Sequence, residues 1–129
     1  MTFEVRGHHL PLSNALKRHA ERRLAFALRR FDRWIGGVKV RISDVNGPRG
    51  GVDKFCQITA EMVPTGVVRV EASDADAYVV IDRAADRLEQ TVRRSVWRIR
   101  DARRGRASIR QAEGLVRMRQ MSYGPHPGA

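Results

Sequence analysis

The most regular pattern of apolar positions in the chain runs through residues 75–100. Apolar side chains recur there every three or four residues, and no Gly or Pro interrupts them, as on one face of an α-helix. These positions are Tyr78, Ile81, Ala85, Leu88, Val92, Val96 and Ile99. Ser73 and Asp76 resemble a capping box at the start of the pattern. The pattern therefore predicts a long amphipathic helix that buries this stripe in a core.

A second amphipathic helix and four strands are predicted upstream. The helix spans residues 14–33, and the glycines at 36–37 end it. Its apolar face consists of Leu16, Ala20, Leu24, Ala27, Leu28 and Phe31. Apolar and polar residues alternate, as they do in half-buried strands, over residues 2–6, 38–43, 55–62 and 67–72. Turn-forming residues at 46–51 and 64–66 connect the last three strands, which indicates an antiparallel meander.

The order of these elements, β-α-β-β-β-α, predicts the α+β class. The simplest packing places both helices on one face of a four-stranded sheet, which is also the plan of a double-stranded-RNA-binding domain. Residues 1–102 would form this domain. Beyond residue 102 the apolar periodicity fades and arginines dominate, so residues 103–129 are expected to be a basic tail that is disordered in isolation. A short helix over residues 109–121, formed on a partner, is the alternative for the tail.

The charge of the chain changes the interpretation of the polar helix faces. The formal net charge is +11, the pI is near 11.4, and 22 of the 25 basic residues are arginines. An arginine side chain pairs bidentately with phosphate and stacks on bases, which favours a nucleic-acid partner. A GC-rich genome is an alternative source of the arginine bias.

Both predicted helices carry arginines opposite their apolar stripe, with few acidic residues three or four positions away to neutralise them. An ordinary solvated surface is the alternative, but two such rows favour a polyanionic partner. The candidate RNA-binding residues are Arg22, Arg23, Arg29 and Arg30 on the first helix and Arg83, Arg87, Arg94 and Arg98 on the second. Phe26 lies off the apolar stripe among arginines and is a candidate for stacking on an unpaired base. Rim packing is its alternative role.

The sequence contains no specific catalytic or metal-binding pattern. His8 and His9 should point to opposite sides of an extended chain, and no third ligand lies near them in sequence. The glycines at 47–51 lack the Lys-Ser/Thr ending of a phosphate-binding loop. Cys56 is the only cysteine, which excludes an internal disulfide and suggests a core position. We therefore expect a protein that is not an enzyme and that needs no cofactor, metal or small-molecule substrate.

The chain shows no apolar signal segment at its start and no run of eighteen apolar residues. With a single cysteine, this predicts a cytoplasmic protein without a membrane partner.

Several short motifs in the predicted helices resemble one family. Asp76-Ala-Tyr78, Ile81 and Arg87-Leu88-Glu89 are similar to its second helix, and Arg23-Leu24-Ala25 and Phe31-Asp32-Arg33 are similar to its first. With the order of elements, they make residues 1–100 resemble the ribosome hibernation-promoting factor family of the RaiA type, in its short single-domain form. The resemblance implies binding to the small ribosomal subunit in the channel used by mRNA and tRNA. This would block tRNA binding and stall translation without chemistry.

The resemblance also bears on individual residues. It places Arg23, Arg29, Arg87 and Arg94 at positions where the family uses basic residues against ribosomal RNA. Phe26 and Gln90 depart from that pattern. The chain ends before the extra domain with which long members pair ribosomes, so we expect it to be monomeric away from the ribosome. Two alternatives stay open, a free double-stranded-RNA-binding module and a regulator that binds an acidic protein partner in sigma-factor modulation.

Overall fold

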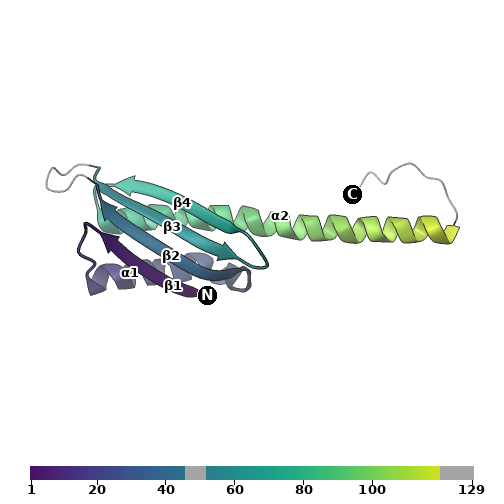
Figure 1. Ribbon diagram of the computed structural model, residues 1–129, viewed down its shortest axis with the longest axis horizontal. Coiled ribbons are helices and arrows are strands. Elements are labelled where there is room, and N and C mark those ends of the chain that lie inside the picture. The colour runs from purple at the N-terminus through teal and green to yellow at the C-terminus, as the bar shows by residue number, and fades with distance from the viewer. Residues whose placement is uncertain (46–51, 120–129) are drawn as a thin grey trace. The chain divides into compact units, whose positions relative to one another are not determined.

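The computed structural model describes residues 1–45 and 52–119, and its side chains as far as Gly105 (Figure 1). The elements are β1 (Thr2–His8), α1 (Asn14–Leu28), the 3₁₀ helix η1 (Arg29–Trp34), β2 (Ile35–Asp44), β3 (Lys54–Met62), β4 (Val67–Asp74) and α2 (Ala77–Arg119). The chain falls into two compact units, one over Met1–Arg93 and one that begins at Arg94. The first unit contains the whole sheet, α1 and the first turns of α2.

The four strands form one sheet in the order β1-β2-β3-β4. β1 is parallel to β2, while β2–β3 and β3–β4 are antiparallel. One row of paired residues crosses all four strands: Val5, Val40, Ile58 and Val70. All four side chains are buried, so the alternation along each strand places its apolar residues on one common face. The predicted α+β class and four-stranded sheet are confirmed.

Both helices of the first unit cover this apolar face, as Figure 1 shows. Ser13 caps the start of α1, and its side-chain oxygen accepts a hydrogen bond from the backbone nitrogen of Leu16 at 3.1 Å. The buried residues of α1 are Leu16, Ala20, Leu24, Ala27 and Leu28, all of which belong to the predicted stripe. The predicted placement of both helices on one side of the sheet is thereby confirmed.

The start of α2 differs from the prediction in two details. The capping group is Asp76 alone, whose Oδ1 accepts hydrogen bonds from the backbone nitrogens of Tyr78 at 2.7 Å and Val79 at 3.2 Å. Tyr78 was expected in the core but is 42% exposed, and Val80 is buried in its place. Tyr78 lies in the first turn of α2, and its ring and the His19 ring of α1 form a T-shaped pair with ring centres 5.1 Å apart. The core stripe therefore starts two residues later than the apolar pattern suggested.

The ends of both helices also differ from the prediction. Residues 29–33 were expected to continue the first helix but belong to η1, a 3₁₀ helix with a narrower turn than an α-helix. Phe31 and Trp34 of η1 are buried. α2 was expected to end near Arg100 but continues to Arg119, because residues 101–119 contain no proline and only two glycines. The expected separate tail over residues 103–129 remains a prediction. The turn at 46–51 and residues 120–129 lie outside the described residues.

Candidate nucleic-acid interface

The outward side of α1 and the start of η1 present an aromatic ring among exposed arginines. Arg22, Arg29 and Arg30 are exposed, and Phe26 is 72% exposed. The guanidinium carbon of Arg29 lies 5.9 Å from the centre of the Phe26 ring, a cation–π arrangement. Positions 22, 26 and 29 are separated by four and three residues, so they share one side of the helix. Rim packing does not account for Phe26 at this exposure.

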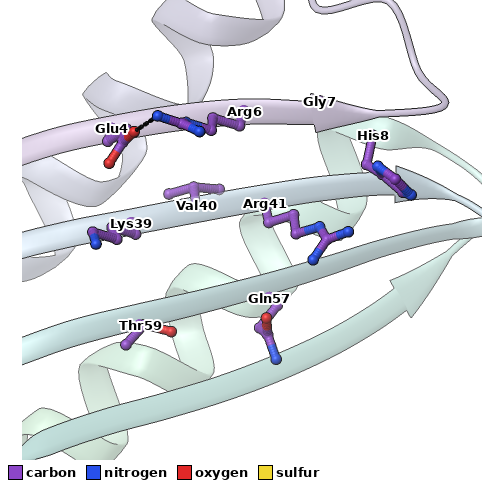
Figure 2. A pocket seen from close by; sticks show the side chains of 9 residues that line it. All are labelled: Glu4, Arg6, Gly7, His8, Lys39, Val40, Arg41, Gln57 and Thr59. Atoms are coloured by element: carbon purple, nitrogen blue, oxygen red, sulfur yellow. Dashed lines mark ion pairs between the residues drawn. The ribbon is translucent and has the colours of Figure 1, made fainter.

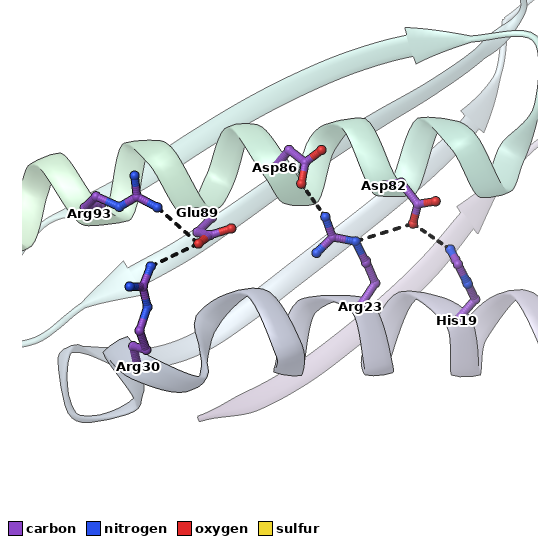
Figure 3. A network of polar contacts seen from close by, with 7 residues as sticks. All are labelled: His19, Arg23, Arg30, Asp82, Asp86, Glu89 and Arg93. Atoms are coloured by element: carbon purple, nitrogen blue, oxygen red, sulfur yellow. Dashed lines mark hydrogen bonds and ion pairs between the residues drawn. The ribbon is translucent and has the colours of Figure 1, made fainter.

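A network of ion pairs joins α1 to α2 (Figure 3). Asp82 Oδ1 lies 2.8 Å from His19 Nε2 and 3.6 Å from Arg23 Nε, while Asp86 accepts a hydrogen bond from the Arg23 guanidinium. The Arg23 side chain is only 24% exposed. Arg23 thus holds the two helices together, and its charge is largely used within the protein.

The same kind of pairing occurs at the other end of the helix pair. One carboxylate oxygen of Glu89 lies 3.2 Å from both Arg30 Nη2 of η1 and Arg93 Nη2 of α2 (Figure 3). The sequence spacing within one helix did not predict the partners of Arg23 and Arg30, because their carboxylates, Asp86 and Glu89, belong to α2. The basic surface between the helices is therefore less positively charged than the sequence suggested.

The candidate arginines at the start of α2 reach towards β4. Arg83 Nε lies 3.5 Å from Asp74 Oδ2, and Arg87 donates a hydrogen bond to the backbone carbonyl of Glu71. Both arginine side chains are nevertheless exposed, so their outward surface stays accessible. These contacts fix the direction of each guanidinium group relative to the sheet.

Arg94 and Arg98 belong to the second unit and are exposed on α2. Arg98 lies within 3.5 Å of the Arg94 carbonyl and of the Ser95 hydroxyl. Trp97, which lies between them in the sequence, is 61% exposed. Within the part of the chain that the structure describes, no acidic side chain forms an ion pair with Arg22, Arg29, Arg94 or Arg98.

The two adjacent histidines do not point apart as predicted. His9 has a φ of 54°, which turns the chain out of the extended conformation, and the two ring centres are 4.1 Å apart. Across residues 1–45 and 52–119, no group of three His, Cys, Asp or Glu side chains is placed to hold a metal ion. No described helix is long and apolar enough to cross a membrane.

Comparisons with known proteins bear on the first unit and the start of the second. The model of the sigma 54 modulation protein / S30EA ribosomal protein family matches residues 3–100. The ribosome hibernation promotion factor of Bacillus subtilis (strain 168) is 30% identical over 95 residues, which are 73% of this chain and 48% of the relative. The chain therefore spans about half the length of this curated relative.

Two solved structures resemble the fold. The N-terminal domain of Thermus thermophilus Protein Y is 35% identical, with 72% of this chain and 93% of that chain covered and a TM-score of 0.57. A ribosomal subunit interface protein from Coxiella burnetii is 18% identical, with 74% and 97% covered and a TM-score of 0.62, and it supports the fold alone.

Proposed function

Because this chain belongs to the sigma 54 modulation protein / S30EA ribosomal protein family, we propose that it is a ribosome hibernation factor that binds the small ribosomal subunit. Binding would occupy the channel used by mRNA and tRNA, block tRNA and stop translation by occupancy, without any chemical step. The names of the Bacillus subtilis relative and of the Coxiella burnetii structure support a ribosomal partner.

The observation that carries the proposal is the exposed group formed by Arg22, Phe26 and Arg29. Two guanidinium groups without an acidic partner among the described residues can neutralise phosphates, and the aromatic ring between them can stack on an unpaired base. Structured ribosomal RNA offers phosphates and unpaired bases together, whereas a regular duplex offers only the phosphates.

The eight candidate arginines contribute in three ways under this proposal. Arg22, Arg29, Arg94 and Arg98 contact phosphates directly. Arg23 and Arg30 chiefly position the helices through Asp86 and Glu89, and Arg83 and Arg87 contact RNA from positions fixed by β4. Phosphate contacts set orientation and affinity, so the rigid helix pair would determine which part of the RNA is bound.

The test compares two single charge reversals by measuring the affinity for purified small subunits over a range of salt concentrations. Arg22→Glu should weaken binding roughly tenfold and lower the salt slope by about one, because one phosphate contact is lost. Arg69→Glu makes the same charge change on an exposed position of β4, on the opposite face of the sheet. It should weaken binding no more than about threefold and leave the slope unchanged, since it acts only through net charge.

Equal losses in the two variants, both still folded by circular dichroism, would refute the assigned helix surface. The wild-type protein should also compete with tRNA for the subunit and bind it more tightly than a plain RNA duplex. Equal affinity for the duplex would favour the free double-stranded-RNA-binding module. Binding to an acidic protein in nuclease-treated extract, without subunit binding, would favour the regulator.

A further inference from the structure

The face of the sheet turned away from α1 and α2 carries an open hollow of about 580 Å³ across β1, β2 and β3. Figure 2 shows the polar side chains that stand on this face. The basic lining residues are Arg6, Lys39 and Arg41, and Glu4 is the one acidic residue among the lining residues. His8, Gln57 and Thr59 complete the polar surface. This group shares no residue with the helix surface proposed above.

The register of the sheet concentrates positive charge in this hollow. Arg6 on β1 is paired directly with Arg41 on β2. Like charges opposite each other on neighbouring strands destabilise a sheet unless another charge compensates. Glu4 neutralises Arg6, with its Oε1 2.5 Å from Arg6 Nη2 (Figure 2). Among the described residues, no carboxylate forms an ion pair with Arg41, which stands beside His8.

The lowered pKa of His8 is consistent with a positive potential in this hollow. The pKa of His8 is lowered by the charge of His9, by partial loss of solvent and by the charge of Arg41, in that order. Each charge effect disfavours a further positive charge at this place and so favours an anion.

A second hollow of about 460 Å³ adjoins the first and shares His8, Arg41 and Gln57 with it. Phe55 and His9 line the second hollow, and Phe55 is partly exposed. Asp44 also lines it, and its carboxylate is paired with Lys54 Nζ at 3.4 Å. An aromatic surface therefore lies directly beside the arginine-rich one. A ligand that matches both must carry an anionic group and a flat ring, as a nucleotide does, and the two hollows together offer room for more than one nucleotide.

We propose that this face of the sheet is a second nucleic-acid site, which binds a short single-stranded RNA segment. A phosphate lies between Arg6 and Arg41, and the adjacent base stacks on Phe55 and the histidine rings. Thr59 and the amide oxygen of Gln57 offer hydrogen bonds to the sugar or the base edge, while the Gln57 amide nitrogen donates to Glu71 Oε1 at 3.2 Å. An acidic peptide would satisfy the arginines but leave the aromatic surface unused.

The experiment follows the histidine ring signals of the full chain by NMR during titration with hexauridylate. The His8 and His9 rings should shift together with one dissociation constant. The ring of His19 is hydrogen-bonded to Asp82 on the other side of the sheet, so the His19 signal monitors the helix surface separately. A failure of the sheet site is thus distinguishable from a failure of the proposed ribosome-binding surface.

Two matched variants locate the site. Arg41→Ala should weaken the His8 and His9 response at least fivefold, whereas Arg69→Ala, an equal loss of charge on β4 of the same face, should change it less than twofold. Equal effects of the two variants, or no shift of His8 and His9 at saturating hexauridylate, would overturn the proposal. Shifts of equal size and affinity with hexaglutamate or with inorganic phosphate would also overturn it, since the aromatic surface would then contribute nothing.

Discussion

Arg22 and Arg23 are adjacent in the sequence but lie in different surroundings. The Arg23 side chain is 24% exposed and pairs with Asp82 and Asp86 of α2, whereas Arg22 is exposed and forms no ion pair with the described residues. One arginine therefore stabilises the helix pair and the other is available to a ligand. The two should respond differently to substitution.

We expect Arg23→Ala to lower the free energy of unfolding by about 0.5 to 1 kcal/mol, since it removes a partly exposed ion-pair network. Arg22→Ala should change it by less than about 0.5 kcal/mol. Urea denaturation measures both values. A double-mutant cycle of Arg23→Ala with Asp86→Ala should give a coupling of about 0.5 kcal/mol. No coupling would show that this ion pair does not hold the helices.

Phe26 tests base stacking separately from charge. Phe26→Leu keeps an apolar side chain on α1 but removes the ring, so stability should stay within about 0.5 kcal/mol while affinity for small subunits falls roughly fivefold or more. Phe26→Tyr should retain most of the affinity, because its ring can stack in the same way. If Phe26→Leu binds as tightly as the wild type, Phe26 does not stack on RNA.

Cys56 should make the free energy of unfolding decrease as the pH rises above about 9. Burial in the core raises the pKa of its thiol from about 9 to about 12. In the unfolded chain the thiol loses its proton above about pH 9, whereas in the folded protein it stays protonated up to about pH 12. The unfolded state then binds fewer protons, so stability falls as pH rises through this window, by up to about 1.4 kcal/mol per pH unit.

The comparison with Cys56→Ala isolates this effect from other groups that titrate in the same range. The variant should be less stable at neutral pH, because a buried side chain is shortened. Its stability should fall less steeply between pH 9 and 11 in urea denaturation. Parallel pH profiles for the two proteins would contradict the assignment of the slope to this thiol.

At the scale of the elements, the strands were predictable because apolar and polar residues alternate along each of them. Val40, Ile58 and Val70 each occupy the inward position that alternation predicted, and the register brings them into one row. The helix ends were less predictable. Residues 29–33 have no helix-breaking residue, and their 3₁₀ conformation follows from the connection to β2 rather than from their own sequence.

For the candidate site, the sequence identified which arginines the helices carry but not which carboxylates pair with them. Sequence spacing identifies neighbours on one helix, and it correctly showed few acidic residues near the arginines. It gave no sign that Asp86 and Glu89 of α2 would meet Arg23 and Arg30 across the helix pair, because that contact depends on how two elements pack. The arginine row on the sheet was missed for the same reason, since Arg6 and Arg41 become neighbours only through strand register.

At the scale of the whole molecule, removing the residues after Arg104 tests whether charge alone determines binding to the small subunit. Truncation after Arg104 removes four arginines and one glutamate, all outside the unit over Met1–Arg93. Subunit binding should weaken severalfold with a smaller salt slope, because general phosphate attraction is reduced. Competition with tRNA at saturating protein should be unchanged. A truncated protein that binds the subunit but no longer displaces tRNA would place the functional surface in the removed segment.

The parallel pairing of β1 with β2 determines the order in which this molecule can fold. Thr2 pairs with Gly37 and His8 with Ser43, so each contact of this pair closes a loop that contains all of α1 and η1. The β3–β4 pair closes a much shorter loop, and loop closure costs more entropy as the loop grows. We therefore expect β1 to join a meander that has already formed. Of these four strands, β1 is synthesised first, so it must wait until α1, η1 and β2 have also been made before it can pair with β2.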